Sequence, residues 1–290
     1  MRMMSSHRIN VIGSSGFIGS NVLASLQALG LPVAGYASKD LDLLNKSAIA
    51  ASGELFGQNC FFIFCSAVGR TTDNSLASLL ANVSMADNFL SQMPVKPHGI
   101  LYLSTIDVYG ERSCKAGHKE NALPYPTDYY GVSKLACEHL FLGRGRSLSP
   151  VTILRLPGVF GPADRGNSVI GKMTTSALER RVVRVTNGGR TLRHYLYVKD
   201  LCAIIHRLLT QCSDGIFNCC PAECLPLSSY ARMVGQAVGD DVEIVAEDAP
   251  DSRSYHCCID GSKLLSQLAG LRLKAPSDSI REYVAWRTNP

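Results

Sequence analysis

Two adjacent tyrosines precede a lysine in the stretch DYYGVSK, residues 128–134. On a helix, residues four apart share a face, whereas neighbours are turned about 100° from each other. Tyr130 therefore shares the face of Lys134, and Tyr129 is turned away. A lysine ammonium one turn from a phenol favours the phenolate, so Tyr130 and Lys134 could act together as an acid or base. The alternative is a surface helix with a solvated lysine.

A glycine-rich turn follows the first strand pattern, RINVIG. The segment GSSGFIG spans residues 13–19, and we expect a helix from about Ser20. Backbone amides at a helix amino terminus, without side chains in the way, suit a pyrophosphate, so this turn favours dinucleotide binding over a bare strand-to-helix turn. Phe17 and Ile18 would donate amides while their side chains pack inward. The predicted cofactor contacts in this turn are Gly13, Ser15, Gly16, Phe17, Ile18 and Gly19.

The second strand pattern, LPVAGY, ends at Ala37, Ser38 and Lys39, where an acid commonly accepts hydrogen bonds from the ribose of NAD. A hydroxyl and an ammonium suit a 2′-phosphate better, so we predict NADP(H) contacts from Ser38 and Lys39. Asp40 lies nearby and keeps NAD(H) possible, and a solvated loop lysine is the simpler alternative.

A third feature is the strand pattern HGILYLST, which ends at Ser104 and Thr105. Thr105 could hydrogen-bond the same substrate oxygen as Tyr130, while a nicotinamide gives or takes hydride at the adjoining carbon. These groups together predict carbonyl–alcohol redox chemistry.

Short apolar strands alternate with helical patterns through the first two thirds of the chain. This predicts an α/β fold with a Rossmann-type, doubly wound parallel sheet and a smaller C-terminal substrate lobe. We expect a cofactor-binding domain over residues 1–160, with about 195–220 returning to it, and a substrate lobe over 161–290.

Composition sets further limits. The 290 residues are 46% hydrophobic and 18% charged, with a net charge of +5 from scattered residues, which argues against nucleic-acid and membrane partners. No apolar run is long enough for a membrane span or a signal peptide, so we expect a cytoplasmic protein. Most of the eleven cysteines lie in apolar segments, and we expect free thiols. The group Cys219, Cys220, Cys224, Cys257 and Cys258 lacks a CxxC pair, and adjacent cysteines on a strand face opposite sides, so we predict no metal site.

The motifs GSSGFIG, LSTIDVYG, YYGVSK, LRLPGVFGP and YLYVKDL, in this order, resemble the extended short-chain dehydrogenase/reductase family of nucleotide-sugar epimerases, dehydratases and reductases. The resemblance implies catalytic roles for Thr105, Tyr130 and Lys134, with Lys134 also bonded to the nicotinamide ribose. It places Tyr129 in the pocket wall or between helices. The further residues that it implies are Asp42 and Leu43 at the adenine, Ala67, Asn82 and Pro157 beside the cofactor, and Arg193 at the substrate diphosphate.

Departures from the family patterns narrow the expected activity. Ile106 and Asp107 stand where 4,6-dehydratases carry an acid pair, and isoleucine cannot donate a proton. No acid–base pair for epimerisation at C3 and C5 can be placed among Cys114, His118 and His139, and Gly158 replaces an asparagine of many epimerases. What remains is chemistry at C4. We favour a 4-keto(-6-deoxy) sugar nucleotide reductase, with a 4-epimerase that retains NAD as the alternative and an NADP(H)-sensing or scaffold protein as the non-enzymatic one.

Two substrate-side features are open to more than one interpretation. Asn167 and Ser168 could bind the nucleotide sugar or could cap the helix that begins in VIGKMTTSALERR. Arg253 is a second candidate for the diphosphate, or a solvated arginine. The helical segments at 75–93 and 130–143 carry more apolar residues than one buried face needs, so we expect a homodimer through a four-helix contact.

Overall fold

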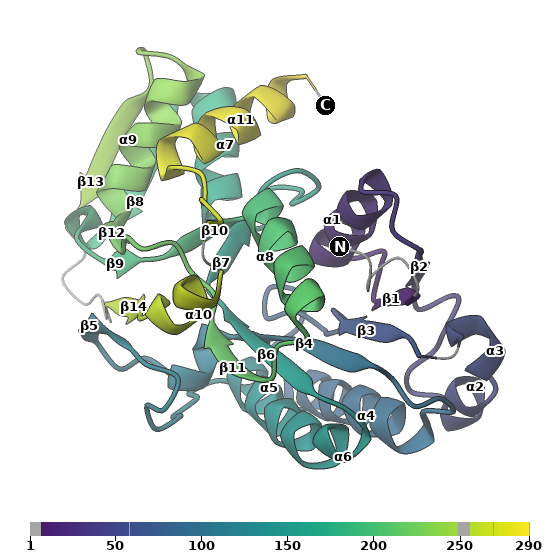
Figure 1. The fold of residues 1–290 in the computed structure, drawn as a ribbon. Helices are drawn as coiled ribbons and strands as arrows, with labels where there is room; N and C mark the ends of the chain where they lie inside the picture. Colours follow the sequence, from purple (N-terminus) through teal and green to yellow (C-terminus); the bar gives the residue numbers. More distant parts are fainter. Residues whose placement is uncertain (1–6, 58, 249–255, 269, 290) are drawn as a thin grey trace. The chain divides into compact units, whose positions relative to one another are not determined.

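The computed structural model describes residues 7–57, 59–248, 256–268 and 270–289 (Figure 1). They form two compact units. The first contains residues up to 110 together with 122–156 and 202–217, and the second contains 111–121, 157–201 and 218–290.

The first unit is built on a six-stranded sheet of order β11-β6-β4-β3-β1-β2 (Figure 1). Strand β1 pairs in parallel with β2 and β3, and β4 pairs in parallel with β3 and β6. This is the predicted Rossmann-type arrangement, in which the carboxyl ends of parallel strands lie at one edge. The strands are β1 (Ile9–Ile12), β2 (Val33–Tyr36), β3 (Phe61–Phe64), β4 (Gly99–Thr105), β6 (Val151–Leu156) and β11 (Gly215–Asn218).

Helices follow the strands as the sequence periodicity predicts. The Ser75 side chain caps α4 in a capping box with Ser78, and Asp128 caps α5 through the Gly131 amide. The helix after the glycine turn begins at Phe17 rather than Ser20, because Gly16 already takes the extended N-cap conformation. The helices are α1 (Phe17–Ala28), α2 (Lys46–Ala50), α3 (Gly53–Phe56), α4 (Leu76–Gln92), the 3₁₀ turn η2 (Ile106–Tyr109), α5 (Tyr129–Leu140), the π-helical turn η3 (Phe141–Gly145), α6 (Arg146–Leu148) and α8 (Val198–Gln211).

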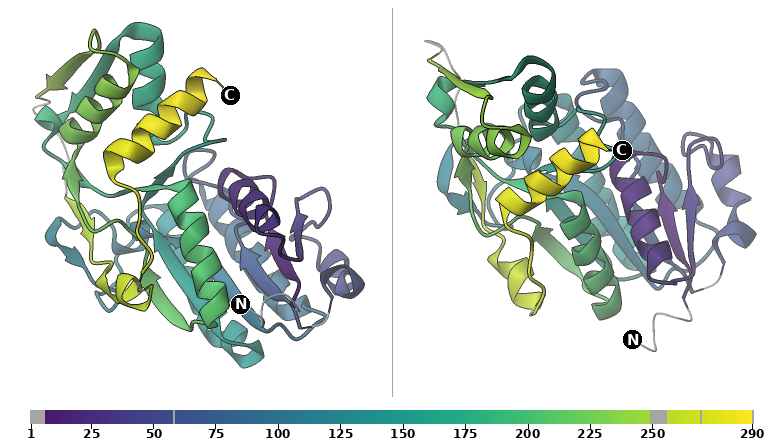
Figure 2. Two further views of the ribbon diagram at one scale, coloured as in Figure 1. Left: turned by 45° about the horizontal axis from the view of Figure 1, so that its top comes forward. Right: turned by 90° about the horizontal axis from the view of Figure 1, so that it is seen from above.

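The second unit contains a four-stranded sheet of order β12-β9-β14-β5 and two two-stranded sheets, β10-β7 and β13-β8. Helix α9 packs against α7 and α11, and Figure 2 shows these helices from two further sides. The elements are β5 (Cys114–His118), β7 (Gly158–Phe160), α7 (Val169–Arg180), β8 (Val182–Thr186), the 3₁₀ turn η4 (Asn187–Gly189), β9 (Leu192–Arg193), β10 (Tyr195–Tyr197), β12 (Leu225–Pro226), α9 (Leu227–Val238), β13 (Glu243–Glu247), β14 (Cys257–Ile259), α10 (Ser262–Gln267) and α11 (Pro276–Thr288).

The unit boundaries differ from the predicted ones in two places. Residues 111–121 belong to the second unit because β5 pairs with β14. The returning segment is 202–217 rather than about 195–220, because β10 pairs with β7 inside the second unit. Both differences come from strand pairings between distant parts of the chain.

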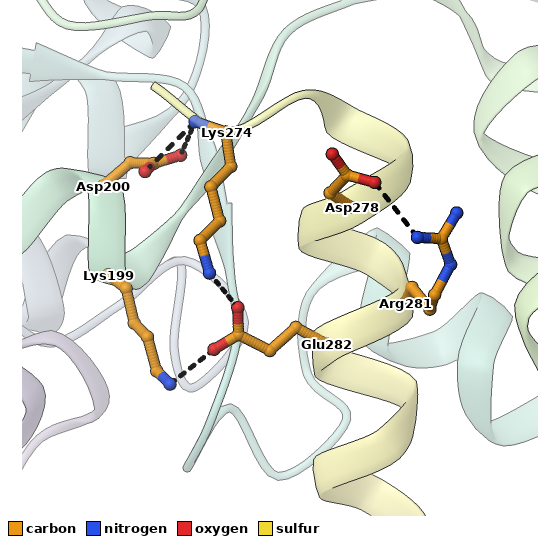
Figure 3. Close-up of polar contacts among 6 residues, drawn as sticks. All are labelled: Lys199, Asp200, Lys274, Asp278, Arg281 and Glu282. Atoms are coloured by element: carbon orange, nitrogen blue, oxygen red, sulfur yellow. Dashed lines mark hydrogen bonds and ion pairs between the residues drawn. The ribbon is translucent and has the colours of Figure 1, made fainter. Parts of the chain in front are cut away.

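Charged contacts hold the C-terminal helix α11 in the second unit (Figure 3). The Glu282 carboxylate on α11 accepts hydrogen bonds from the Lys199 and Lys274 ammonium groups, and Asp200 accepts from the backbone N–H of Lys274 at 3.2 and 3.4 Å. Burial raises the pKa of Asp200 to about 6, although the Lys274 amide opposes this shift. Near the start of α11, Arg281 pairs with Asp278, one turn before it.

One disulfide contradicts the expectation of free thiols. Cys224 and Cys258 are bonded, and the other nine cysteines are free. The prediction was wrong for this pair because β12 and β14 both pair with β9, and these pairings bring two cysteines 34 positions apart close together.

Exposed apolar side chains support the predicted dimer contact, which stays a prediction. Leu76 and Leu80 share a face of α4 and are 56% and 55% exposed, and Val132 on α5 is 39% exposed. We expect Leu80→Glu to shift the mass in light scattering towards the 31.3 kDa of one chain. Exposed Glu111→Gln is the control, and a wild-type protein of that mass at micromolar concentration would refute the dimer. Among the described residues, no helix is both long and apolar enough to cross a membrane.

Candidate active site

The glycine turn between β1 and α1 is packed tightly at both ends and open in the middle. Gly13 has a φ of +86°, and a Cβ there would lie 2.7 Å from the Ser66 hydroxyl. A Cβ on Gly19 would lie 2.2 Å from the Gly13 carbonyl oxygen. These two glycines are therefore required by the fold of the turn. A Cβ on Gly16 would meet only the Gly13 carbonyl oxygen, at 3.4 Å.

The amino terminus of α1 fits an anionic ligand. Gly16 is the N-cap and provides no side-chain hydrogen bond to the first turn, which begins with Phe17, Ile18 and Gly19. Ser15 and Gly16 are exposed, and the Phe17 and Ile18 side chains are half-buried. Uncapped amides beside an open glycine are the features that a dinucleotide pyrophosphate needs.

At the end of β2, the acidic residue Asp40 forms a hydrogen bond within its own turn. The Asp40 carboxylate accepts a hydrogen bond from the Ala37 amide at 2.9 Å. Ser38 and Lys39 are exposed. The polar groups that this strand end offers to a ligand therefore include a hydroxyl and an ammonium.

The two predicted adenine contacts differ in exposure. Asp42 is exposed and accepts from the Leu44 amide at 2.9 Å. The Leu43 side chain is 5% exposed and belongs to the core of the first unit. Leu43 therefore lacks an exposed side chain for the predicted contact with adenine.

The two hydroxyls at the end of β4 have different partners. Ser104 is buried and donates to Glu138 at 2.6 Å. Thr105 accepts from the Asp107 amide at 3.2 Å, which begins the turn η2, and its hydroxyl hydrogen remains available to donate. Because consecutive strand residues point to opposite faces, only Thr105 suits the predicted catalytic role.

Helix α5 carries Lys134 to the end of β4. The Lys134 ammonium is buried, donates to the Leu103 carbonyl, and lies 4.2 Å from the centre of the Tyr102 ring. Burial lowers its pKa to about 8. A Cβ on Gly131 would lie 2.8 Å from the Asp107 carbonyl oxygen, so this glycine allows α5 to approach η2 closely.

Tyr130 is half-buried in the first turn of α5, whereas Tyr129 is 47% exposed. Both tyrosines lie in the first turn of α5, and Tyr130 is the less exposed of the two. The place of Tyr129 in the pocket wall or between helices stays a prediction. Burial, with a smaller effect from Asp107, raises the pKa of Tyr130. The predicted stabilisation of the phenolate by Lys134 and a nicotinamide's positive charge stays a prediction; in the protein alone, burial raises the pKa of the phenol and the Lys134 ammonium bonds to Leu103.

Asn82 holds the loop after β3 against α5. Its carboxamide bonds to the Val68 amide at 2.7 Å, the Val68 carbonyl at 3.1 Å and the Ser133 hydroxyl at 3.1 Å. Both amide hydrogens are used in this way, so Asn82 positions the loop that carries the exposed Ala67. Its predicted place beside the cofactor agrees with this supporting role.

A buried charged network lies behind the site and was missed in the sequence. Arg155 on β6 bonds to Glu138 on α5 at 3.0 and 2.7 Å and to the Tyr109 hydroxyl at 2.9 Å. Glu138 also accepts from Ser104. The network joins β4, η2, α5 and β6, the elements that position Thr105 and Lys134. An arginine inside the apolar strand VTILRL was the signal that could have indicated it.

Asn167, Ser168 and Arg193, three of the predicted substrate residues, belong to the second unit. Ser168 caps α7 through the Gly171 amide at 2.9 Å and donates to Asp164, so its capping interpretation is confirmed, and Asn167 is exposed. Arg193 is half-buried on β9 and donates to the Leu192 carbonyl at 3.0 Å.

Pro157 is buried, and Ile106 is 7% exposed within η2, so no proton donor occupies its place. Arg253 lies outside the described residues.

The fold and site define a dinucleotide-binding α/β class with a Tyr-x-x-x-Lys pair at the end of the fourth strand. Residues 9–220 match the model of the NAD dependent epimerase/dehydratase family, and the chain belongs to this family.

Relatives with several different activities match the chain. The chain is 25% identical over 277 residues to GDP-6-deoxy-D-mannose reductase of Pseudomonas aeruginosa, with 89% of this chain and 88% of that protein covered. Three other curated relatives are longer than this chain. The regions of these relatives that match this chain make up 30%, 18% and 29% of their respective lengths.

Solved structures share the fold. UDP-glucose 4-epimerase from Thermus thermophilus in complex with NAD has a TM-score of 0.82 at 22% identity, covering 97% of this chain and 99% of that chain. RMD from Pseudomonas aeruginosa complexed with NADPH has a TM-score of 0.81 at 22% identity, covering 98% and 100%. At this identity the likeness establishes the fold alone.

Proposed function

We propose that this protein is a reductase that uses NADPH to convert the C4 ketone of a nucleotide-linked 4-keto or 4-keto-6-deoxy sugar into an alcohol. The carbonyl carbon gains a hydride and its oxygen gains a proton, while NADPH becomes NADP⁺. The observation that carries the proposal is the Thr105, Tyr130 and Lys134 set at the end of β4, combined with a buried isoleucine at position 106.

Each member of the set has a distinct task. Thr105 donates a hydrogen bond to the substrate oxygen, which orients the carbonyl. Tyr130 is protonated at neutral pH because burial raises its pKa, so it can deliver a proton to the same oxygen. Lys134 is held at β4 by the Leu103 carbonyl and is the candidate partner of the nicotinamide ribose. A bound nicotinamide cofactor supplies the hydride.

Ile106 argues against dehydration. Elimination of water from a sugar needs an acid and a base beside the reacting carbons. Ile106 is a buried hydrocarbon, and Asp107 pairs with Arg70 at 3.4 Å. The site therefore supports reduction better than elimination.

The preference for NADPH rests on the end of β2. A 2′-phosphate can bind an ammonium and a hydroxyl, and Ser38 and Lys39 are exposed there while Asp40 bonds to Ala37. A reductase must exchange its cofactor at each turnover, whereas a 4-epimerase regenerates a retained NAD.

The test follows from that difference. We would denature the purified protein, identify released dinucleotide by mass spectrometry, titrate the emptied protein with NADPH and NADH, and follow NADPH oxidation with 4-keto-6-deoxy sugar nucleotides. Tighter NADPH binding and substrate-dependent oxidation support the reductase. Tightly retained NAD together with interconversion of C4 epimers would refute the reductase and indicate a 4-epimerase. Cofactor binding without turnover of any sugar nucleotide would favour a sensor or scaffold.

Replacing Lys39 should discriminate between the two cofactors. We expect Lys39→Met to weaken NADPH binding by about tenfold or more, since one charge-assisted bond to the 2′-phosphate is lost. NADH binding should stay the same. Lys46→Met, at an exposed lysine that begins α2, is the control in fluorescence titrations. Equal loss for both cofactors would count against a 2′-phosphate contact.

Gly16 provides a second binding test. We expect Gly16→Ala to change the free energy of unfolding by less than about 1 kcal/mol, because its Cβ meets only one atom at 3.4 Å. The methyl group would still separate the pyrophosphate from the α1 amides and weaken NADPH binding by about tenfold. Gly143→Ala, with no atom within 4 Å of its added Cβ, is the matched control. Unchanged binding in Gly16→Ala would place the pyrophosphate elsewhere.

A further inference from the structure

Three residues meet in the four-stranded sheet of the second unit. His194 directly follows β9, Cys224 directly precedes β12, and Cys258 is the middle residue of β14. Strand β9 pairs with both β12 and β14, so the sheet brings these positions together. A ring nitrogen of His194 and the two Sγ atoms all lie within 4.8 Å of one another.

His194 has a buried ligand atom without a partner. Its side chain is 2% exposed, and its Nδ1 has no hydrogen-bond partner among the residues that the structure describes. A neutral imidazole keeps a lone pair on one of its ring nitrogens. A buried polar atom without a partner is unusual and indicates a missing group or a second state of the site.

The imidazole is oriented by the chain neighbours of the two cysteines. The ring forms hydrogen bonds with the backbone of Glu223 and Ile259. With Nδ1 unpaired, Nε2 is the donor. A histidine whose second nitrogen bonds to backbone carbonyls is the usual arrangement of a metal-binding imidazole.

We propose that reduced Cys224 and Cys258, together with Nδ1 of His194, form a binding site for Zn²⁺, and that the Cys224–Cys258 disulfide is the oxidised form of this site. Two thiolates and one imidazole are ligands that zinc prefers, at about 2.3 Å and 2.0–2.1 Å. Ligand atoms already within 4.8 Å of one another can reach these distances by small side-chain rotations. Water completes the coordination.

The two forms interconvert by balanced chemistry. A dithiol gives two electrons and two protons to the Cys224–Cys258 bond, which breaks to two thiols while the dithiol becomes a disulfide. Zinc binding then displaces the two thiol protons to solvent. Cys224 is half-buried while the other two residues are buried, so we expect a reductant to attack at Cys224.

The positions of the neighbouring cysteines explain why the sequence pattern did not predict a metal site. Cys257 precedes Cys258 on the same strand and therefore faces the opposite side of the sheet. Cys220 is buried, and its Sγ is 3.6 Å from the Ile259 carbonyl. The proposed site combines Cys224 and Cys258, which lie 34 positions apart, with a histidine that follows β9, and linear spacing does not reveal this combination.

The test compares two preparations of the wild-type protein. One is reduced with dithiothreitol and desalted anaerobically, the other keeps its disulfide, and both are titrated with Zn²⁺ against a chromogenic chelator. We expect one Zn²⁺ per chain in the reduced protein and none in the oxidised protein. Co²⁺ in place of Zn²⁺ should give thiolate charge-transfer absorption only after reduction. Equal zinc binding in both preparations, or none in either, would overturn the proposal.

Variants identify the ligands. Cys258→Ser and His194→Gln should each weaken Zn²⁺ binding by at least about 100-fold. Cys257→Ala, on the opposite face of the same strand, should keep full stoichiometry. Circular dichroism separates loss of a ligand from loss of fold, and the wild-type comparison stands where a variant does not fold. Full binding by folded Cys258→Ser would refute the site, whatever the NADPH experiments show.

Discussion

Replacing Tyr130 by phenylalanine is expected to lower kcat for the reduction of a 4-keto sugar nucleotide by about 10²- to 10⁴-fold, the usual contribution of a positioned general acid. Tyr130 is half-buried in the first turn of α5, and its raised pKa keeps the proton on the phenol at neutral pH. Phenylalanine keeps the ring and removes the proton. NADPH binding and the unfolding midpoint should therefore change little.

Tyr129→Phe is the matched control, because it removes a hydroxyl from the neighbouring position, whose side chain is 47% exposed. Steady-state kinetics with both variants, alongside NADPH titrations, separate catalysis from binding. If Tyr129→Phe lowered kcat and Tyr130→Phe stayed fully active, Tyr129 rather than Tyr130 would be the proton donor. Full activity of both variants would show that neither tyrosine is the general acid.

Replacing Glu138 by alanine is expected to destabilise the protein by about 3–5 kcal/mol, the usual cost of leaving one charge of a buried pair uncompensated. The side chains of Arg155 and Glu138 are 3% and 2% exposed, and the change leaves a buried guanidinium and the Ser104 hydroxyl without their acceptor. The effect should be smaller if water enters the cavity.

Urea unfolding measures this loss, and an exposed ion pair provides the control. Arg144 and Asp87 lie 3.0 Å apart with side chains that are 49% and 38% exposed. Asp87→Ala should cost less than about 1 kcal/mol. If Glu138→Ala lowered the free energy of unfolding by no more than Asp87→Ala does, the buried network would not stabilise the end of β4.

Local patterns were enough to predict the first unit. Apolar runs such as FFIF and alternating helices specify the parallel strands, and Gly13, Gly16 and Gly19 mark the turn because backbone conformation there depends on near neighbours. Capping chemistry likewise predicted the role of Ser168, whose partners lie within four residues.

Features that depend on distant residues were not predictable in the same way. The pairing of β5 with β14 and the Cys224–Cys258 bond depend on the arrangement of short strands in the second unit, which carry almost no periodic signal. Burial, which depends on many residues together, raises the pKa of Tyr130, and the spacing between Tyr130 and Lys134 carries no information about this effect.

The route of the chain restricts how this protein can be divided. The backbone passes from one unit to the other five times, after residues 110, 121, 156, 201 and 217. The sequence suggested a boundary at residue 160. A fragment that begins after this residue would lack β5, the strand that pairs with β14. A domain exchange that moves the second unit of this protein must therefore transfer the 111–121 segment as well as the C-terminal part, because a single crossover point cannot carry that unit intact.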